Sequence, residues 1–211
     1  GNPVEKSFSP VLQNTIAREL GFNSAYVPFK VERGSVNTAV RGGEALGIKG
    51  FNVTVPHKIE VMDALCGIDP VAEHIGAVNT LKLTDNGYVG YNTDIIGLKK
   101  CLEARKIEIQ GKTVVLAGAG GAANSAAMLA GEEKAGQLII VNRTAKKAEN
   151  LAERVRKYYP IDVKVMDYCS ITNIENPDIF IQTTSVGMGN DIDGTPVSNP
   201  QFFDNVKIVV D

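Results

Sequence analysis

One stretch decides the fold, and it reads Thr113-Val-Val-Leu-Ala-Gly-Ala-Gly-Gly-Ala-Ala123. The residues before its first glycine are β-branched or apolar, which predicts a short buried strand. Gly118, Gly120 and Ala123 then fit the Gly-x-Gly-x-x-Ala fingerprint of a dinucleotide-binding turn between a strand and a helix. In that fingerprint the first glycine permits a tight turn. The second lets the backbone approach a pyrophosphate, and the alanine lets helix and strand pack closely.

Strands and helices alternate on the carboxyl side of this fingerprint. An alanine-rich helix is followed by a strand over Leu138 to Val141 and a charged helix over Ala145 to Tyr158. Further strand patterns occupy residues 163–165, 179–181 and 208–210. Such alternation is typical of an α/β, Rossmann-type domain with a doubly wound parallel sheet. Residues 108–211 are therefore predicted to bind a dinucleotide.

The end of the second strand indicates which dinucleotide is bound. NAD sites usually carry an acidic residue there, whereas this chain has Asn142-Arg143-Thr144, with Lys147 shortly after. Arginine and lysine suit the additional 2′-phosphate of NADP because they form charge-assisted hydrogen bonds with it. The alternative is the basic first turn of a solvated helix, although lysines there oppose the helix dipole. The sequence therefore favours NADP.

A second informative stretch, Phe51-Asn-Val-Thr-Val-Pro-His-Lys58, lies in the amino-terminal half. Its alternation predicts a half-buried strand that ends at the proline, with Asn52 and Thr54 together on a polar face. Lys58 begins a helix-like stretch over residues 58–65, beside the carboxyl end of the strand, where ligands of open α/β sheets bind. Lys58 is therefore a candidate proton donor to a small polar substrate, the alternative being a solvated lysine beside an edge strand.

Other polar residues of this half are candidates for substrate binding, each with a structural alternative. Ser7 and Ser9 lie at a predicted helix start, where hydroxyls and backbone amides suit a carboxylate, although Ser9 suits an N-cap equally well. Asp94 also suits an N-cap, but beside Lys58 it would favour the protonated lysine. Asn79 suits either substrate hydroxyls or a turn.

The amino-terminal residues 1–94 are predicted to form an α/β substrate domain, joined by a connecting helix at 95–107 to the Rossmann-type domain, with a cleft between the two. Within the first domain we expect a helix from Ser9 to about Leu20, with Ser9 as its N-cap. A short strand at residues 25–27, a helix at 37–46 and a hairpin around Asn86-Gly87 complete the expected elements.

Composition excludes several classes of partner. The 211 residues are 44% hydrophobic and 22% charged, which is ordinary for a soluble globular protein. A net charge of −2 gives no reason to expect nucleic acid or a membrane surface as a partner. Cys66, Cys101 and Cys169 are scattered, which argues against disulfides and for a reducing cytoplasm. With only His57 and His74 besides, no metal site is expected.

Further motifs continue these stretches in a fixed order along nearly the whole chain. They are Gly1-Asn2-Pro3 with Ser7-x-Ser9-Pro10, Asn52-Val53-Thr54-Val55-Pro56-x-Lys58, Gly76-Ala77-Val78-Asn79-Thr80, Asn92-Thr93-Asp94, Gly118-Ala119-Gly120-Gly121-Ala122-Ala123, Asn142-Arg143-Thr144 and Thr183-Thr184-Ser185-Val186-Gly187-Met188. In this order the chain resembles the shikimate dehydrogenase family. The motifs of the first half are the specific ones, since glutamyl-tRNA reductase and other oxidoreductases share those of the second.

The resemblance implies NADPH-dependent reduction of 3-dehydroshikimate to shikimate, a step of aromatic amino-acid biosynthesis. It implies Lys58 and Asp94 as the catalytic pair, and Ser7 and Ser9 as ligands of the substrate carboxylate. The remaining substrate oxygens would be bound by Asn52, Thr54 and Asn79. The implied NADP-binding residues are Gly118, Gly120, Gly121, Ala122, Ala123, Asn142, Arg143, Thr144, Lys147, Thr184, Ser185, Gly187 and Met188.

Members of this family normally begin with a strand before Gly1 and continue past Asp211, so we expect this chain to lack the first strand and a carboxyl-terminal segment. Two rival functions stay open, a quinate/shikimate dehydrogenase that tolerates NAD and a non-catalytic shikimate sensor. Arg143-Thr144 argues against the first, and the intact Lys58 and Asp94 argue against the second. A monomer and a homodimer are equally compatible with the sequence.

Overall fold

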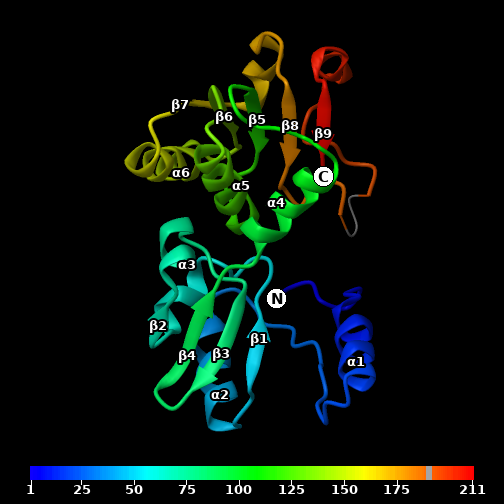
Figure 1. Ribbon diagram of the computed structural model, residues 1–211, viewed down its shortest axis with the longest axis vertical. Helices are drawn as coiled ribbons and strands as arrows, with labels where there is room; N and C mark the ends of the chain where they lie inside the picture. Colours follow the sequence, from blue (N-terminus) through cyan, green and yellow to red (C-terminus); the bar gives the residue numbers. More distant parts are fainter. Residues whose placement is uncertain (189–191) are drawn as a thin grey trace. The chain divides into compact units, whose positions relative to one another are not determined.

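The chain forms two compact units, shown in Figure 1. The computed structural model describes residues 1–188 and 192–211. The first unit comprises Gly1–Asp69 and Val78–Tyr91, and the second comprises Pro70–Ala77 and Asn92–Asp211. Across the described parts of the chain, no helix is both long and apolar enough to cross a membrane.

The first unit is built on a mixed four-stranded sheet with the order β1-β3-β4-β2. Its strands are β1 (Gly50–Asn52), β2 (Gly67–Ile68), β3 (Thr80–Thr84) and β4 (Gly87–Tyr91). The β3–β4 pair is antiparallel and joined by a tight turn, so the predicted hairpin is confirmed. Helix α2 (Val36–Ala45) confirms the helix expected at 37–46 and buries Val36 and Val40. In contrast, α1 (Ser9–Glu19) buries no residue.

Three local predictions for this unit were wrong. The strand expected over Phe51 to Val55 is regular only at Gly50–Asn52. No strand is assigned at residues 25–27, because the backbone of Tyr26 bonds to the Asn14 side chain instead of a neighbouring strand. The helix-like stretch at 58–65 is a short 3-10 helix, Glu60–Ala64, held by bonds between residues three apart such as Leu65 N–H to Met62 O.

The second unit is an open, fully parallel sheet with the order β7-β6-β5-β8-β9, which confirms the predicted Rossmann-type fold. Its strands are β5 (Thr113–Ala117), β6 (Gln137–Val141), β7 (Asp162–Met166), β8 (Ile179–Gln182) and β9 (Ile208–Val210). Its α-helices are α3 (Pro70–Ile75), α4 (Asp94–Ala104), α5 (Gly121–Glu132) and α6 (Ala145–Tyr158). The described residues of the unit also form the 3-10 helices η2 (Tyr168–Asn173) and η3 (Pro200–Asn205).

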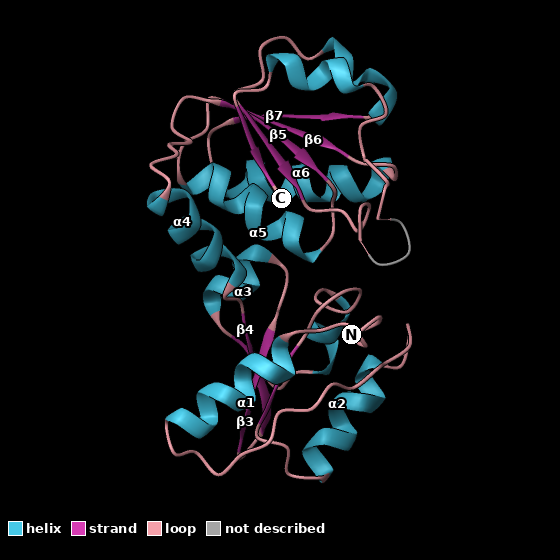
Figure 2. Cartoon of the chain, turned by 90° about the vertical axis from the view of Figure 1, so that its right-hand side faces the viewer, coloured by secondary structure: helices cyan, strands magenta, loops and turns pink. Residues whose placement is uncertain are grey.

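Both faces of this sheet are covered, as Figure 2 shows. On one face Val114 and Leu116 of β5 pack with residues of α4, α5 and α6. On the other face Val115 packs with Ile171 of η2 and Phe202 of η3. A parallel strand that is buried on both faces reads as an unbroken apolar run, which is why Thr113 to Ala117 does not alternate. Full burial of a side chain such as Leu116 typically contributes about 1.5–3 kcal/mol to stability.

Candidate cofactor and substrate sites

The predicted cofactor residues lie at one edge of the second unit's sheet. Because β5 pairs in parallel with both β6 and β8, the carboxyl ends of these strands, at Ala117, Val141 and Gln182, lie side by side. The fingerprint follows β5, the basic segment follows β6, and the segment 183–188 follows β8. The connections from β5 lead to β6 on one side, whereas β8 lies on the other. Such a reversal at the carboxyl edge is where open α/β sheets bind their ligands.

Gly118 is required by its conformation and by its neighbours. Its φ is +117°, and a Cβ added there would lie 2.6 Å from Thr183 Oγ1. The Gly118 N–H donates to Val141 O at 2.9 Å, while the Thr183 hydroxyl donates to Ala117 O at 2.7 Å. These bonds join the turn to the ends of β6 and β8. Because the Thr183 hydroxyl lies so close, no side chain larger than hydrogen fits at position 118.

Gly120 differs from Gly118, because the structure leaves open space beside it. It occupies the N-cap position of α5, where no side chain accepts a hydrogen bond from the helix start, and a Cβ added to it would meet no atom within 4 Å. Gly121 and Ala122 begin the helix behind it, and the fully buried Ala123 packs into the core beside the sheet. Amide donors of a helix start that face open space form the kind of surface that binds a pyrophosphate. The fingerprint residues therefore fit a dinucleotide.

The segment after β6 offers exposed positive charge. Arg143, Thr144 and Lys147 are exposed, and Asn142 Nδ2 donates to Thr144 O at 2.9 Å, which shapes the turn before α6. The first turn of α6 carries no acidic residue. Burial raises the pKa of the nearby Tyr168 hydroxyl, while the Arg143 charge acts in the opposite direction. This exposed positive charge at a helix start whose first turn carries no acidic residue suits a phosphate group.

The segment after β8 folds back on itself through its own polar groups. Thr184 Oγ1 accepts from the Val186 N–H at 3.2 Å, and Ser185 O accepts from the Met188 N–H at 3.2 Å. Gly187 has a φ of +87°, which favours glycine. The turn presents Ser185 and Met188 as exposed residues at the same sheet edge as Gly118.

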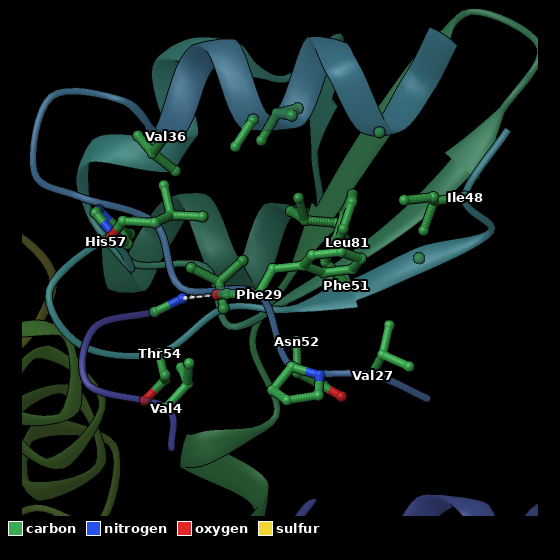
Figure 3. Close-up of a pocket in the computed structure, with 18 of the residues that line it drawn as sticks. Val4, Val27, Phe29, Val36, Ile48, Phe51, Asn52, Thr54, His57 and Leu81 are labelled. Carbon is green, nitrogen blue, oxygen red and sulfur yellow. Dashed lines mark hydrogen bonds between the residues drawn. The ribbon is translucent and has the colours of Figure 1, made fainter. Parts of the chain in front are cut away.

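The first unit contains a pocket of about 650 Å³. Four of the predicted substrate residues line it, namely Ser7, Ser9, Asn52 and Thr54. Figure 3 shows Phe51 and Leu81 on the side of α2, and Asn52 and Thr54 on the opposite side of β1 and its continuation. The alternation of the Phe51–Lys58 stretch thus separates an apolar wall from a polar one.

The three other predicted catalytic and substrate-binding residues, Lys58, Asn79 and Asp94, are not among the residues that line this pocket. The backbone O of Lys58 accepts a hydrogen bond from the Val78 N–H at 2.7 Å. Lys58 is thereby bonded to the segment that carries Asn79. Asn79 is 8% exposed, and its backbone bonds to both Val53 and Tyr91. Asp94 belongs to the second unit and is partly buried at the first position of α4.

The N-cap alternatives for Ser9 and Asp94 were both wrong. Ser9 is the first residue of α1 rather than its N-cap, and its N–H donates to Ser7 Oγ at 3.2 Å. At α4 the capping acceptor is the buried Asn92, whose Oδ1 accepts from the Asp94 and Ile95 N–H groups at 2.9 and 3.4 Å. Ser9 and Asp94 are thus each the first residue of their helix, not its N-cap.

Sequence reasoning missed three residues that organise these sites. Asn92 holds the start of α4 and donates to Ala77 O at 2.9 Å. Tyr26 and Thr80 bond to predicted substrate residues, the first to Asn52 and the second to Asn79. The Asn-x-Asp pattern before a helix is a capping signal that could have identified Asn92. No local signal marks Tyr26 or Thr80.

Family comparisons agree with both halves of the chain. Residues 1–81 match the shikimate dehydrogenase substrate-binding domain, and residues 101–188 match the shikimate/quinate 5-dehydrogenase domain. The chain belongs to the shikimate dehydrogenase family. Members of this family therefore supply the relevant comparisons for both units.

Curated relatives and solved structures of the family resemble the chain over most of its length. A shikimate dehydrogenase (NADP+) from Caldanaerobacter subterraneus subsp. tengcongensis is 43% identical over 202 residues, covering 94% of this chain and 71% of the relative. Another, from Methanocaldococcus jannaschii, is 40% identical over 215 residues, covering 100% of this chain and 75% of the relative. The crystal structure of a shikimate dehydrogenase in complex with NADP+ has a TM-score of 0.82 at 40% identity. The match covers 94% of this chain and 69% of that one.

Proposed function

We propose that the protein catalyses the reversible, NADPH-dependent reduction of 3-dehydroshikimate to shikimate, a step of aromatic amino-acid biosynthesis. The observation that carries this proposal is the agreement of both halves of the chain with one family, whose relatives at 40–43% identity are NADP+-dependent shikimate dehydrogenases. The first unit supplies the residues for the substrate and the second supplies the edge for the cofactor.

The second unit holds the cofactor. Gly118 permits the tight turn after β5, Gly120 leaves room for the pyrophosphate at the start of α5, and Arg143 and Lys147 would bind the 2′-phosphate. Thr184, Ser185, Gly187 and Met188 lie on the nicotinamide side. NADPH supplies the hydride that the ketone carbon receives.

The first unit binds and orients the substrate. Ser7 and Ser9 donate hydrogen bonds to the carboxylate, and the side chains of Asn52, Thr54 and Asn79 bind the remaining oxygens. Reduction of a ketone places negative charge on its oxygen. The Lys58 ammonium donates a proton to that oxygen or stabilises the alkoxide, and Asp94 favours the protonated lysine in the same step.

An absorbance assay of NADPH formation tests the proposal. The purified protein is incubated with shikimate or quinate and with NADP+ or NAD+, and the initial rates are compared. We expect the highest kcat/KM with shikimate and NADP+. Equal rates with quinate or NAD+ would indicate a quinate/shikimate dehydrogenase. Binding of shikimate without turnover in any combination would indicate a sensor.

Two further properties stay predictions. The protein is expected to act as a monomer or a homodimer on small molecules, which light scattering of the purified protein resolves. A cytoplasmic location is expected from the cysteine content, and fractionation of the source cells tests it.

A further inference from the structure

A chain of hydrogen bonds connects two of the proposed substrate residues within the first unit. Tyr26 Oη donates to Asn52 Oδ1 at 3.1 Å. On the other side of that amide, Asn52 Nδ2 donates to Thr80 Oγ1 at 3.5 Å, the longest of these three hydrogen bonds. The Thr80 hydroxyl in turn donates to Asn79 Oδ1 at 2.9 Å.

In the structure the three bonds of this chain run in one direction, from Tyr26 to Asn52, from Asn52 to Thr80 and from Thr80 to Asn79. A hydroxyl has one hydrogen to donate, so Thr80, which donates to Asn79, can only accept from Asn52. The Asn52 amide must therefore present its nitrogen to Thr80 and its oxygen to Tyr26. The Asn79 amide presents its oxygen to Thr80. Both amides are thereby held in one of their two orientations.

Tyr26 is itself held from two sides. Its backbone N–H donates to Asn14 Oδ1 at 2.7 Å, and its backbone O accepts from Asn14 Nδ2 at 2.8 Å, which attaches the segment to α1. Burial raises the pKa of the Tyr26 hydroxyl, against the effect of a hydrogen bond with the Ser9 side chain. The phenol therefore stays protonated at neutral pH and available as a donor. Tyr26 also lines the pocket beside Ser9 and Asn52.

We propose that Tyr26 and Thr80 are positioning residues of the substrate site, whose hydroxyls fix the amide orientations of Asn52 and Asn79. The inference rests on the proposed function, because it assigns these amides to the oxygens of shikimate. An amide rotated by 180° places an acceptor where the substrate needs a donor. Loss of either hydroxyl therefore weakens substrate binding without any change at the cofactor site.

The test is steady-state kinetics of Tyr26→Phe, Thr80→Val and the double variant with shikimate and NADP+. Each single variant should raise the KM for shikimate about three- to tenfold, the range for one lost hydrogen bond between neutral groups. The KM for NADP+ and the melting temperature should change little. The double variant should show less than the product of the single effects, because both hydroxyls belong to one chain.

Two further variants separate positioning from a general loss of stability. Thr80→Ser keeps the hydroxyl and should restore a KM near that of the wild type. Thr84→Val makes the same change on the same strand at a hydroxyl that donates to Gly87 O in the hairpin, so it should lower the melting temperature and leave the KM for shikimate unchanged.

An unchanged KM for shikimate in both Tyr26→Phe and Thr80→Val, with an active wild type, would overturn the inference alone. Parallel increases of the KM for NADP+ would also overturn it, since they would show a general structural effect. A wild type that does not oxidise shikimate would instead overturn the proposed function and, with it, this inference.

Discussion

The two units build their sites from different materials. In the second unit the site consists mainly of backbone, namely the glycine turn after β5 and the amides at the start of α5. In the first unit the proposed site consists of side chains from separate segments, among them Ser7, which accepts from the Ser9 backbone N–H, and Asn52 and Asn79, which bond to the Thr80 side chain. A backbone site depends on where glycine is permitted, whereas a side-chain site depends on which hydroxyl or amide faces which neighbour.

This difference predicts how each site fails. A substitution in the backbone site acts through strain or through the volume of a new Cβ atom. A substitution in the side-chain site acts through a lost donor or acceptor, and it leaves the fold largely intact. Kinetic and thermal measurements on the same variants therefore distinguish the two sites.

The largest effect is expected for Lys58→Ala. A positioned proton donor typically contributes about 10²–10⁴-fold to rate, so kcat should fall within that range while the KM for shikimate changes far less. Stopped-flow or steady-state measurement of kcat tests this. Near-normal turnover would show that Lys58 is a solvated lysine.

Asp94→Asn extends that test to the second unit. It should also lower kcat if, as proposed, the Asp94 carboxylate favours the charged form of Lys58. In the Lys58→Ala background the same change should have little additional effect if the two residues serve one step. Fully multiplicative losses would contradict a shared role.

A matched pair of glycine variants comes next. Gly118→Ala forces a Cβ into a φ of +117° and within 2.6 Å of Thr183 Oγ1. Such strain typically amounts to about 1–3 kcal/mol, so the melting temperature should fall by several degrees. Gly120→Ala meets no atom within 4 Å and should leave the melting temperature nearly unchanged. Its methyl group should nevertheless weaken NADP+ binding by roughly 10–100-fold, through lost amide contacts with the pyrophosphate.

Calorimetry with NADP+ and thermal denaturation measure both quantities for each variant. Equal affinity of Gly120→Ala and wild type for NADP+ would show that the open space above α5 does not hold the pyrophosphate. An unchanged melting temperature of Gly118→Ala would contradict the strain argument.

A smaller effect is expected in the first unit for the double variant Ser7→Ala/Ser9→Ala. Two hydroxyl bonds to a carboxylate should be lost, raising the KM for shikimate by roughly 10–100-fold with the KM for NADP+ unchanged. Ser9→Ala alone should not lower the melting temperature, because Ser9 does not cap α1. Ser7→Ala removes the acceptor of the Ser9 N–H and should lower the melting temperature slightly. A reduced melting temperature with an unchanged KM for shikimate would show that these serines stabilise the fold and do not bind the substrate.

The last of these substitutions, Arg143→Ala, tests which cofactor the second unit prefers. One charge-assisted contact is typically worth about 1.5–3 kcal/mol, so the preference for NADP+ over NAD+ should fall by roughly tenfold or more. Because Lys147 remains, some preference should persist. Calorimetric titration with NADP+ and NAD+ measures this preference. An unchanged ratio of the two affinities would contradict the proposal that Arg143 binds the 2′-phosphate.

The sequence by itself determined the second unit almost completely. The unbroken apolar run at Thr113 to Ala117 and the alternation of strands and helices predicted β5, β6 and α6 within a residue or two, and the glycine spacing predicted that a helix, α5, follows β5. These features are local, because a doubly buried parallel strand and a tight turn each constrain residues that are neighbours in the chain.

Only the tertiary structure decided how the substrate residues are held. Tyr26 and Asn52 are 26 residues apart, and Asn52 and Thr80 are 28 residues apart, so no local pattern joins them. The same holds for the segment at residues 25–27, which bonds to the Asn14 side chain in place of a strand. A hydrogen bond between distant side chains depends on where the fold places both partners. Sequence periodicity predicts which face of a helix or strand a residue occupies, but it does not predict which distant side chain forms a hydrogen bond with it there.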